Sequence, residues 1–419
     1  MQHALALEKP HRYAAIVRED AEALKRLLFI SAFVNLLIVS LLGILLRTYP
    51  FFSITFISYK NLLHGHSHFA FGGWVMPAIL ALLLKCFPDL ERAVAYKHWS
   101  NIGFLLLSSA YGMLISFPLQ GYKALSVSFS TLSVVAGFYL AVVTWRALPK
   151  IKSSVALKFF ASGLVYLVIS AAGPFATGPL IAMGKAGTTL YYDAIYFYLH
   201  FQYNGWFSFA VLALLYNYLQ KNEKKTNGRK VLWLMNLACV PSFFLSVLWH
   251  QPGLVFNVVG GIGALLQCFA VVFVVQDARK ISFDNRFVKM IVNISLFALV
   301  TKALLQFFGA FPAVADFAYQ QRNLIIAYLH LVLLGFISLF FLAWFIKHYA
   351  IAAGRQLKTG LALFLLGFVS SELLLLIGVF GLWPGDLQNS LILFVSMLMP
   401  AGFILLLREV FRSSAKRSQ

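Results

Sequence analysis

The chain consists largely of apolar runs, each about as long as a helix that crosses a membrane. A transmembrane helix needs about 20 consecutive apolar residues to span a ~30 Å hydrocarbon core. Twelve such runs follow one another, at 27–47, 63–86, 98–117, 124–148, 155–175, 192–219, 231–250, 254–275, 288–309, 322–347, 357–382 and 388–407. Membrane β-strands would alternate in polarity and be about half as long. The sequence therefore predicts an all-α, polytopic membrane protein with about twelve transmembrane helices.

Charged residues are too sparse for a soluble protein of this size. Only 11% of the 419 residues are charged and 61% are hydrophobic, whereas soluble domains carry roughly 25% charged residues. The net charge of +20 comes from short Lys and Arg clusters between the apolar runs, which indicates membrane topology and not a nucleic-acid partner. Because Cys86, Cys239 and Cys268 form no CxxC pair, neither a disulfide framework nor a zinc knuckle is expected.

The distribution of the cations predicts the orientation of the chain. If the N-terminus is cytoplasmic, all but six of the 34 Lys and Arg residues fall on the cytoplasmic side, as the positive-inside rule requires. The six on or near the outer side are Arg47, Lys60, Lys123, Lys185, Lys302 and Arg322. We expect a cytoplasmic basic segment at 1–26 without a cleavable signal peptide, a membrane domain at 27–407 and a cytoplasmic basic tail at 408–419. The expected location is a bacterial-type inner (cytoplasmic) membrane.

Histidines inside the apolar runs are the candidate functional residues. Six of the ten histidines lie in the second, sixth, seventh and tenth runs, at a similar depth toward the predicted outer face: His64, His66, His68, His200, His250 and His330. Intramembrane histidine is costly and usually functional, and imidazole is the commonest side-chain ligand of haem iron and copper. The alternative is that some of these histidines are interfacial residues that hydrogen-bond lipid or backbone.

The spacing of the histidines indicates how they are presented. His64 and His68 are four residues apart and share one helix face, whereas His66 points to roughly the opposite side. His200, His250 and His330 belong to three separate helices, which is the arrangement expected of a metal site in the core of a helix bundle.

With these positions, the sequence resembles the catalytic subunit of the haem–copper oxidase superfamily, which includes nitric oxide reductases. The family has a twelve-helix core with histidine ligands on helices 2, 6, 7 and 10. The segment HSHFAFGGWVMP looks like the family's helix 2, and its spacing to the proline favours His66 as low-spin haem ligand; the preceding His64-Gly65 pair offers a rival alignment. HFQYNG, which begins at His200, and LHLVLLGF, which contains His330, are similar to the helix 6 and helix 10 segments.

The resemblance implies one intact and one altered cofactor site. His330 and His66, with His64 as the alternative, would hold a low-spin b-type haem for electron transfer. At the second centre, His200 and His250 could still hold copper, iron or zinc, with His68 or His64 as a third ligand.

That second centre departs from the family pattern in several places. Trp249 precedes a lone His250 where the family has two adjacent histidines, and Tyr328 replaces the histidine that holds the high-spin haem. The H-P-E-V-Y motif of the oxidases is absent, and Asn204 stands four residues after His200. Because tyrosine can ligate ferric haem, a second haem stays open, as does an oxidoreductase activity on oxygen or nitric oxide.

Four further charged residues are candidates for supporting roles. Lys302 and Arg322 are candidate partners of haem propionates, and Lys302 could instead snorkel to the interface. Glu372, about halfway along the eleventh run, is a candidate proton-relay carboxylate or a protonated side chain that bonds a neighbouring helix. Asp193 is expected to be an N-cap or interfacial residue.

Two other functions remain open at the sequence level. The chain also resembles the NnrS-type haem- and copper-containing membrane proteins of the nitric oxide stress response, although LHGHSH here lacks the glutamate of their W-H-x-H-E helix. A non-haem transporter or metal-ion permease is the third alternative, against which no paired Gly/Pro-broken helices are visible. The expected partners are the lipid bilayer and an electron-donor protein or small partner subunit.

Overall fold

The computed structural model describes residues 2–52, 54–283 and 285–415, which form helices joined by turns and loops, without a strand. Among the described residues, eleven continuous helical stretches, several of which join consecutive helices, are long and apolar enough to cross a membrane. The predicted run at 192–219 is not among these eleven, although it is helical from Thr189 to Lys221. This stretch carries the buried polar residues His200, Gln202 and Asn204, which lower its hydropathy. The all-helical membrane architecture predicted from the sequence is thus confirmed.

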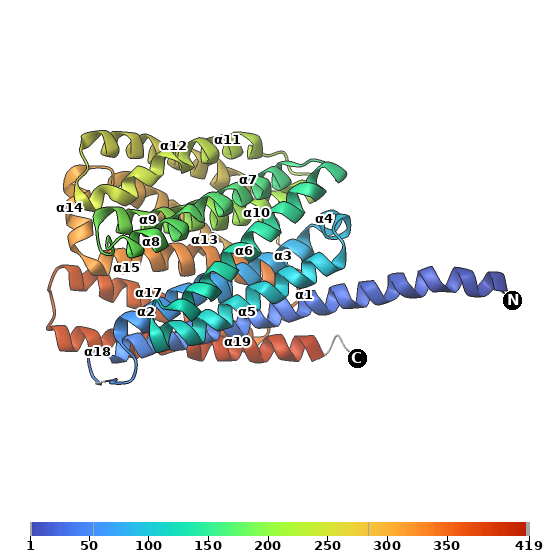
Figure 1. Cartoon of the computed structure of the whole chain (residues 1–419), viewed down its shortest axis with the longest axis horizontal. Helices are drawn as coiled ribbons and strands as arrows, with labels where there is room; N and C mark the ends of the chain where they lie inside the picture. The colour runs from blue at the N-terminus through green and yellow to red at the C-terminus, as the bar shows by residue number, and fades with distance from the viewer. Residues whose placement is uncertain (1, 53, 284, 416–419) are drawn as a thin grey trace. The chain divides into compact units, whose positions relative to one another are not determined.

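The chain forms two compact units, of which unit 1 contains residues 1–151 and 407–419. Its helices, coloured blue to teal in Figure 1, are α1 (Gln2–Thr48), α2 (Tyr59–Phe69), η1 (Ala70–Val75), α3 (Met76–Cys86), α4 (Pro88–Ala93), α5 (Tyr96–Gln120), α6 (Ala124–Ala147) and η2 (Leu148–Lys150). The segment predicted at 1–26 and the first predicted span belong to the single helix α1. Of the predicted tail at 408–419, residues 416–419 lie outside the described residues.

Unit 2 contains residues 152–406. Its helices up to α13 are α7 (Val155–Ser170), α8 (Ala172–Ala182), α9 (Thr189–His200), η3 (Phe201–Phe207), α10 (Ser208–Lys221), α11 (Gly228–Cys239), η4 (Pro241–His250), α12 (Leu254–Ala278) and α13 (Arg286–Phe308). The remainder are α14 (Pro312–Gln320), α15 (Arg322–His330), η5 (Leu331–Ser338), α16 (Leu339–His348), α17 (Arg355–Val379), α18 (Gly385–Ser396) and α19 (Leu398–Ala415), which continues into unit 1.

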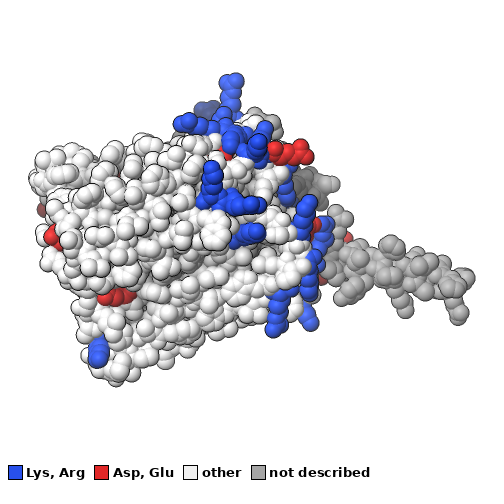
Figure 2. Space-filling view, turned by 90° about the horizontal axis from the view of Figure 1, so that it is seen from above, with Lys and Arg blue, Asp and Glu red and all other residues white. Residues whose placement is uncertain are grey.

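The surface of the helices is apolar, as a bilayer environment requires. Large hydrophobic side chains such as Phe104 on α5 and Phe297 on α13 are each 71% exposed. Most of the visible surface in Figure 2 carries neither a cation nor an acidic residue, and most of the Lys and Arg side chains that it shows lie in groups. Exposing this much apolar surface to water would be costly, so the protein is a multi-pass membrane protein whose helices contact lipid.

Three π-helical segments interrupt the described helices, and each follows a predicted site histidine. Segment η1 begins two residues after His68, η3 directly after His200, and η5 directly after His330. A π-helical segment loosens the regular backbone ladder and occurs frequently at functional sites. Carbonyl groups in these segments accept side-chain hydrogen bonds, for example from Ser295 to Phe336 at 2.7 Å. Each of these histidines therefore lies just before a wider helical turn, and side-chain hydrogen bonds to backbone carbonyl groups support such turns.

A close approach of two helices fixes the α2 histidines in unit 1. A Cβ added to Gly65 would lie 2.7 Å from Cγ of Pro118 on α5, a separation that carbon atoms do not adopt without displacement. Only glycine permits this contact. Because Gly65 lies between His64 and His66, the contact sets which side of α2 faces α5.

Candidate functional site

His330, at the C-terminal end of α15, pairs with an acidic residue of α17. Its Nδ1 lies 3.0 Å from Oε1 of Glu372. The other Glu372 oxygen, Oε2, is buried and has no hydrogen-bond partner among the described residues. Glu372 thus contacts a neighbouring helix, and its role as a proton-relay carboxylate stays a prediction. Within the described part of the chain no hydrogen bond involves Nε2 of His330, so one ring nitrogen is free to bind a metal.

Tyr328 and Arg322 precede His330 on the same helix. The Tyr328 ring packs edge-on against Tyr203 of η3, with 6.3 Å between ring centroids, and Tyr203 also lies beside Ser246 of η4. Arg322 is the first residue of α15 and is exposed. The roles predicted for both residues toward a haem stay predictions.

His200 on α9 is fully buried, and both of its ring nitrogens have protein partners. Nε2 lies 2.8 Å from the backbone carbonyl oxygen of Cys239 on α11. Nδ1 lies 3.1 Å from the amide nitrogen of Asn204 and 3.4 Å from the hydroxyl of Ser246. The imidazole is thus held by α11, η3 and η4 together.

Lys302 reaches the same cluster from α13. The side chain is 0% exposed, and its ammonium group donates hydrogen bonds to Oδ1 of Asn204 and, at 2.9 Å, to Oε1 of Gln267 on α12. The interpretation that Lys302 snorkels to the interface is therefore wrong, because neighbouring amide oxygens solvate the charge inside unit 2.

His250, at the end of η4, interacts with Asp193 of α9. Oδ2 of Asp193 lies 3.2 Å from Nε2 of His250, and Oδ1 accepts a 3.0 Å hydrogen bond from the indole of Trp249. The N-cap role expected for Asp193 is wrong, because Thr188 is the N-cap of α9. The carboxylate instead joins α9 to the adjacent Trp249 and His250.

His200 and His250 have different hydrogen-bond partners in the structure. Asp193, the partner of His250, and His200 itself are seven residues apart on α9, or about 10 Å along a helix. The prediction that these two imidazoles hold one metal ion stays a prediction. Within the residues described, no three His, Cys, Asp or Glu side chains form a metal-binding group.

The α2 histidines occupy two faces of the helix, as their spacing predicts. The His68 ring stacks on Phe117 of α5 with 4.2 Å between ring centroids, and its Nε2 lies 2.9 Å from the Tyr122 hydroxyl. The His64 ring packs edge-on against Tyr122 with 4.7 Å between ring centroids. His66 points elsewhere, because a Cβ on Gly43 of α1 would lie 3.4 Å from Cε1 of its ring. His64 and His68 thus share an aromatic cluster within unit 1, and His66 faces α1.

Sequence reasoning missed the partners that surround these residues. Gln267 and Ser246 solvate Lys302 and His200, and Asp193 binds two side chains of η4. The visible signal for Gln267 was a polar side chain in the middle of the apolar run at 254–275. For Ser246 no comparable signal exists, because serine is tolerated throughout membrane helices.

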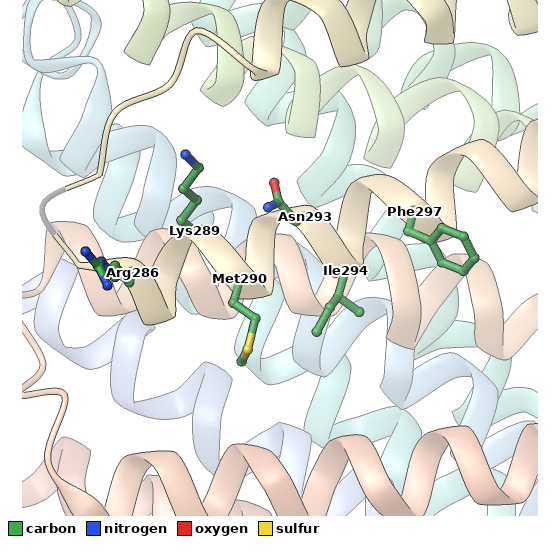
Figure 3. A pocket seen from close by; sticks show the side chains of 6 residues that line it. All are labelled: Arg286, Lys289, Met290, Asn293, Ile294 and Phe297. Atoms are coloured by element: carbon green, nitrogen blue, oxygen red, sulfur yellow. The ribbon is translucent and has the colours of Figure 1, made fainter.

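A groove elsewhere in unit 2 contains none of the predicted ligands. It has a volume of about 410 Å³ and runs along one face of α13 (Figure 3). Its lining residues are Arg286, Lys289, Met290, Asn293, Ile294 and Phe297. The groove is open to the surface and is not the candidate site.

Comparison with known proteins finds structural but not sequence similarity. No protein-family model matches the chain, and no curated protein matches it significantly in sequence. Among solved structures, the chain is similar to a cryo-EM structure of a haem–copper terminal oxidase dimer, with a TM-score of 0.67 at 13% identity. The match covers 93% of this chain and 84% of that chain. This chain is therefore a multi-pass membrane protein with the fold of a haem–copper terminal oxidase.

Proposed function

We propose that this protein binds a low-spin b-type haem and transfers electrons in the membrane, with His330 as an axial ligand. The observation that carries the proposal is the 3.0 Å contact between Nδ1 of His330 and Oε1 of Glu372. A metal-bound histidine usually donates its other ring N–H to a carboxylate or carbonyl group. Donation from Nδ1 to Glu372 leaves the lone pair of Nε2 for iron, so the residues present fit a haem ligand.

Three further observations support this assignment. The π-helical segment η5 begins directly after His330, and such segments are frequent at functional sites. The fold is that of a haem–copper terminal oxidase, and the LHLVLLGF segment around His330 resembles the same superfamily. A transporter is not favoured by any of these features.

The chemistry follows from the ligand type. A b-type haem held by His330 and a second histidine would supply single-electron transfer at this site. In this chain Glu372 fixes the orientation and tautomer of His330. The sequence resemblance implies His66, with His64 as the alternative, as the other histidine of such a haem. An electron-donor protein or small subunit would supply the electrons.

An absorption spectrum of the purified protein tests the proposal. The protein would be produced with an adequate haem supply and recorded oxidised and then dithionite-reduced. We expect sharp, split bands of a low-spin haem on reduction, and a pyridine haemochrome of the b type. A colourless protein that is folded by circular dichroism and monodisperse would contradict the proposal.

The Glu372→Gln substitution should raise the reduction potential of the haem. A carboxylate that accepts the Nδ1 proton makes the imidazole a stronger ligand and favours ferric iron. Because the glutamine side chain would still accept a hydrogen bond but carries no charge, we expect an upward shift on the order of tens of mV with the low-spin spectrum retained. The shift is measured by spectroelectrochemical titration.

The matched control for this variant is Asp386→Asn. Asp386 is an exposed acidic residue at the start of α18, so its replacement removes the same charge away from His330. The potential should stay within a few mV of the unmodified protein. Equal shifts in both variants would show that Glu372 acts through net charge alone and not through His330.

A further inference from the structure

The cluster around His200 has a fixed hydrogen-bond direction. The Lys302 side chain can only donate, so the Asn204 oxygen that faces it is the acceptor. The amide nitrogen of Asn204 therefore faces His200 and donates to Nδ1 at 3.1 Å. Nδ1 is then the acceptor nitrogen, and Nε2 carries the proton donated to the Cys239 carbonyl oxygen at 2.8 Å. The order Lys302, Asn204, His200, Cys239 is a one-way relay.

This relay uses the atoms that a metal would need. A neutral imidazole has one ring nitrogen with a lone pair, which in His200 is Nδ1 and already accepts from Asn204. The other nitrogen carries a proton and faces a carbonyl oxygen, and buried N–H groups are rarely left unpaired. Ligation through either nitrogen would break a buried hydrogen bond within the cluster.

Lys302 prevents the simplest rearrangement. If the Asn204 amide turned over to release Nδ1, its nitrogen would face the Lys302 ammonium, and two donors would meet in a fully buried site. Gln267 holds the ammonium from the other side at 2.9 Å. The second predicted ligand is also occupied, because His250 pairs with Asp193 at 3.2 Å.

We propose that the Lys302 ammonium, held by Asn204 and Gln267, takes the place of the metal ion expected beside His200, so that this part of the protein binds no second transition metal. The cation is then a permanent part of the chain. This proposal is independent of the haem at His330, because it concerns a cluster that shares no hydrogen bond with the His330–Glu372 pair among the described residues.

Metal analysis of the intact protein tests the proposal. The purified protein would be incubated with Cu²⁺, Zn²⁺ or Fe²⁺ in separate samples, desalted, and analysed by mass spectrometry of the elements beside a His200→Ala variant. After haem iron is subtracted, we expect the unmodified protein and His200→Ala to hold the same amount of each metal. One equivalent that the unmodified protein holds and His200→Ala lacks would overturn the proposal.

Nitrogen NMR of the histidines provides a readout that does not depend on metal loading. In protein with ¹⁵N-labelled histidine, the signal lost in His200→Gln identifies His200. We expect that signal to report an Nε2-protonated ring that does not change when Zn²⁺ is added, whereas a shift upon Zn²⁺ addition would contradict the relay. Absence of haem bands together with an unchanged His200 signal would reject the haem proposal and leave this one standing.

Discussion

Replacing His330 with alanine should abolish the low-spin haem spectrum of the reduced protein. Alanine removes the imidazole whose Nδ1 is fixed by Glu372 and whose Nε2 is available to iron. Without the His330 imidazole, a haem at this site would lose one of its histidine ligands and would become high-spin or be lost during purification. The split low-spin bands are therefore expected to disappear entirely, which dithionite-reduced spectra at equal protein concentration would show.

A histidine outside the proposed site provides the control. His98 on α5 is hydrogen-bonded to the Tyr139 hydroxyl at 2.6 Å, and His98→Ala should keep the full low-spin signal. Parallel His66→Ala and His64→Ala variants distinguish the alternatives for the second axial ligand, because only the true ligand should be required for the low-spin bands. If His330→Ala folds and retains an unchanged spectrum, His330 is not the ligand.

His330→Met keeps the test informative if the alanine variant does not fold. Methionine is a weaker donor to ferric iron, and histidine–methionine ligation raises the potential of a haem relative to ligation by two histidines. The variant should therefore either remain low-spin at a higher potential or become high-spin. If both the spectrum and the reduction potential of His330→Met are unchanged, His330 is not a ligand of the haem.

The fold could be predicted from the sequence because apolar length alone determines which segments span a bilayer. The run predicted at 254–275 is a helix over Leu254–Ala278, and that predicted at 288–309 is a helix over Arg286–Phe308. In lipid, backbone groups must be satisfied within the segment, so a long apolar run has few alternatives to a helix. The composition of each segment is therefore sufficient to predict a membrane-spanning helix.

The partners within the site could not be predicted in the same way. The relay joins Lys302 to Asn204, 98 residues away, and to Gln267, 35 residues away. Such contacts depend on how helix faces rotate against each other, which a pattern within one helix does not specify. The sequence therefore indicated His330 and Glu372 as special positions, but only the fold shows that they form a pair.

Replacing Asn204 with leucine should destabilise unit 2 strongly. Leucine has a similar volume but no polar atoms, so Lys302 loses one of its two acceptors and Nδ1 of His200 loses its closer donor. A hydrogen bond to a charged group contributes about 1.5–3 kcal/mol, and an unsatisfied buried group costs about 1–3 kcal/mol. We expect the free energy of unfolding to fall by about 3–5 kcal/mol, as measured by denaturant titration. The Asn389→Leu variant, at an exposed position of α18, should change it by less than about 0.5 kcal/mol.

A second substitution should reverse part of this loss, since the cost arises from a charge left without its acceptor. In the Asn204→Leu background, Lys302→Met removes the buried charge itself, and apolar replacement of both members of a buried polar pair is often neutral or stabilising. The double variant should therefore recover about half or more of the stability lost by Asn204→Leu. Losses that simply add would mean that Lys302 and Asn204 act separately, and the relay would then not hold His200. Recovery would show instead that the ammonium and the amide are one unit, which is the coupling that the proposed role of Lys302 beside His200 requires.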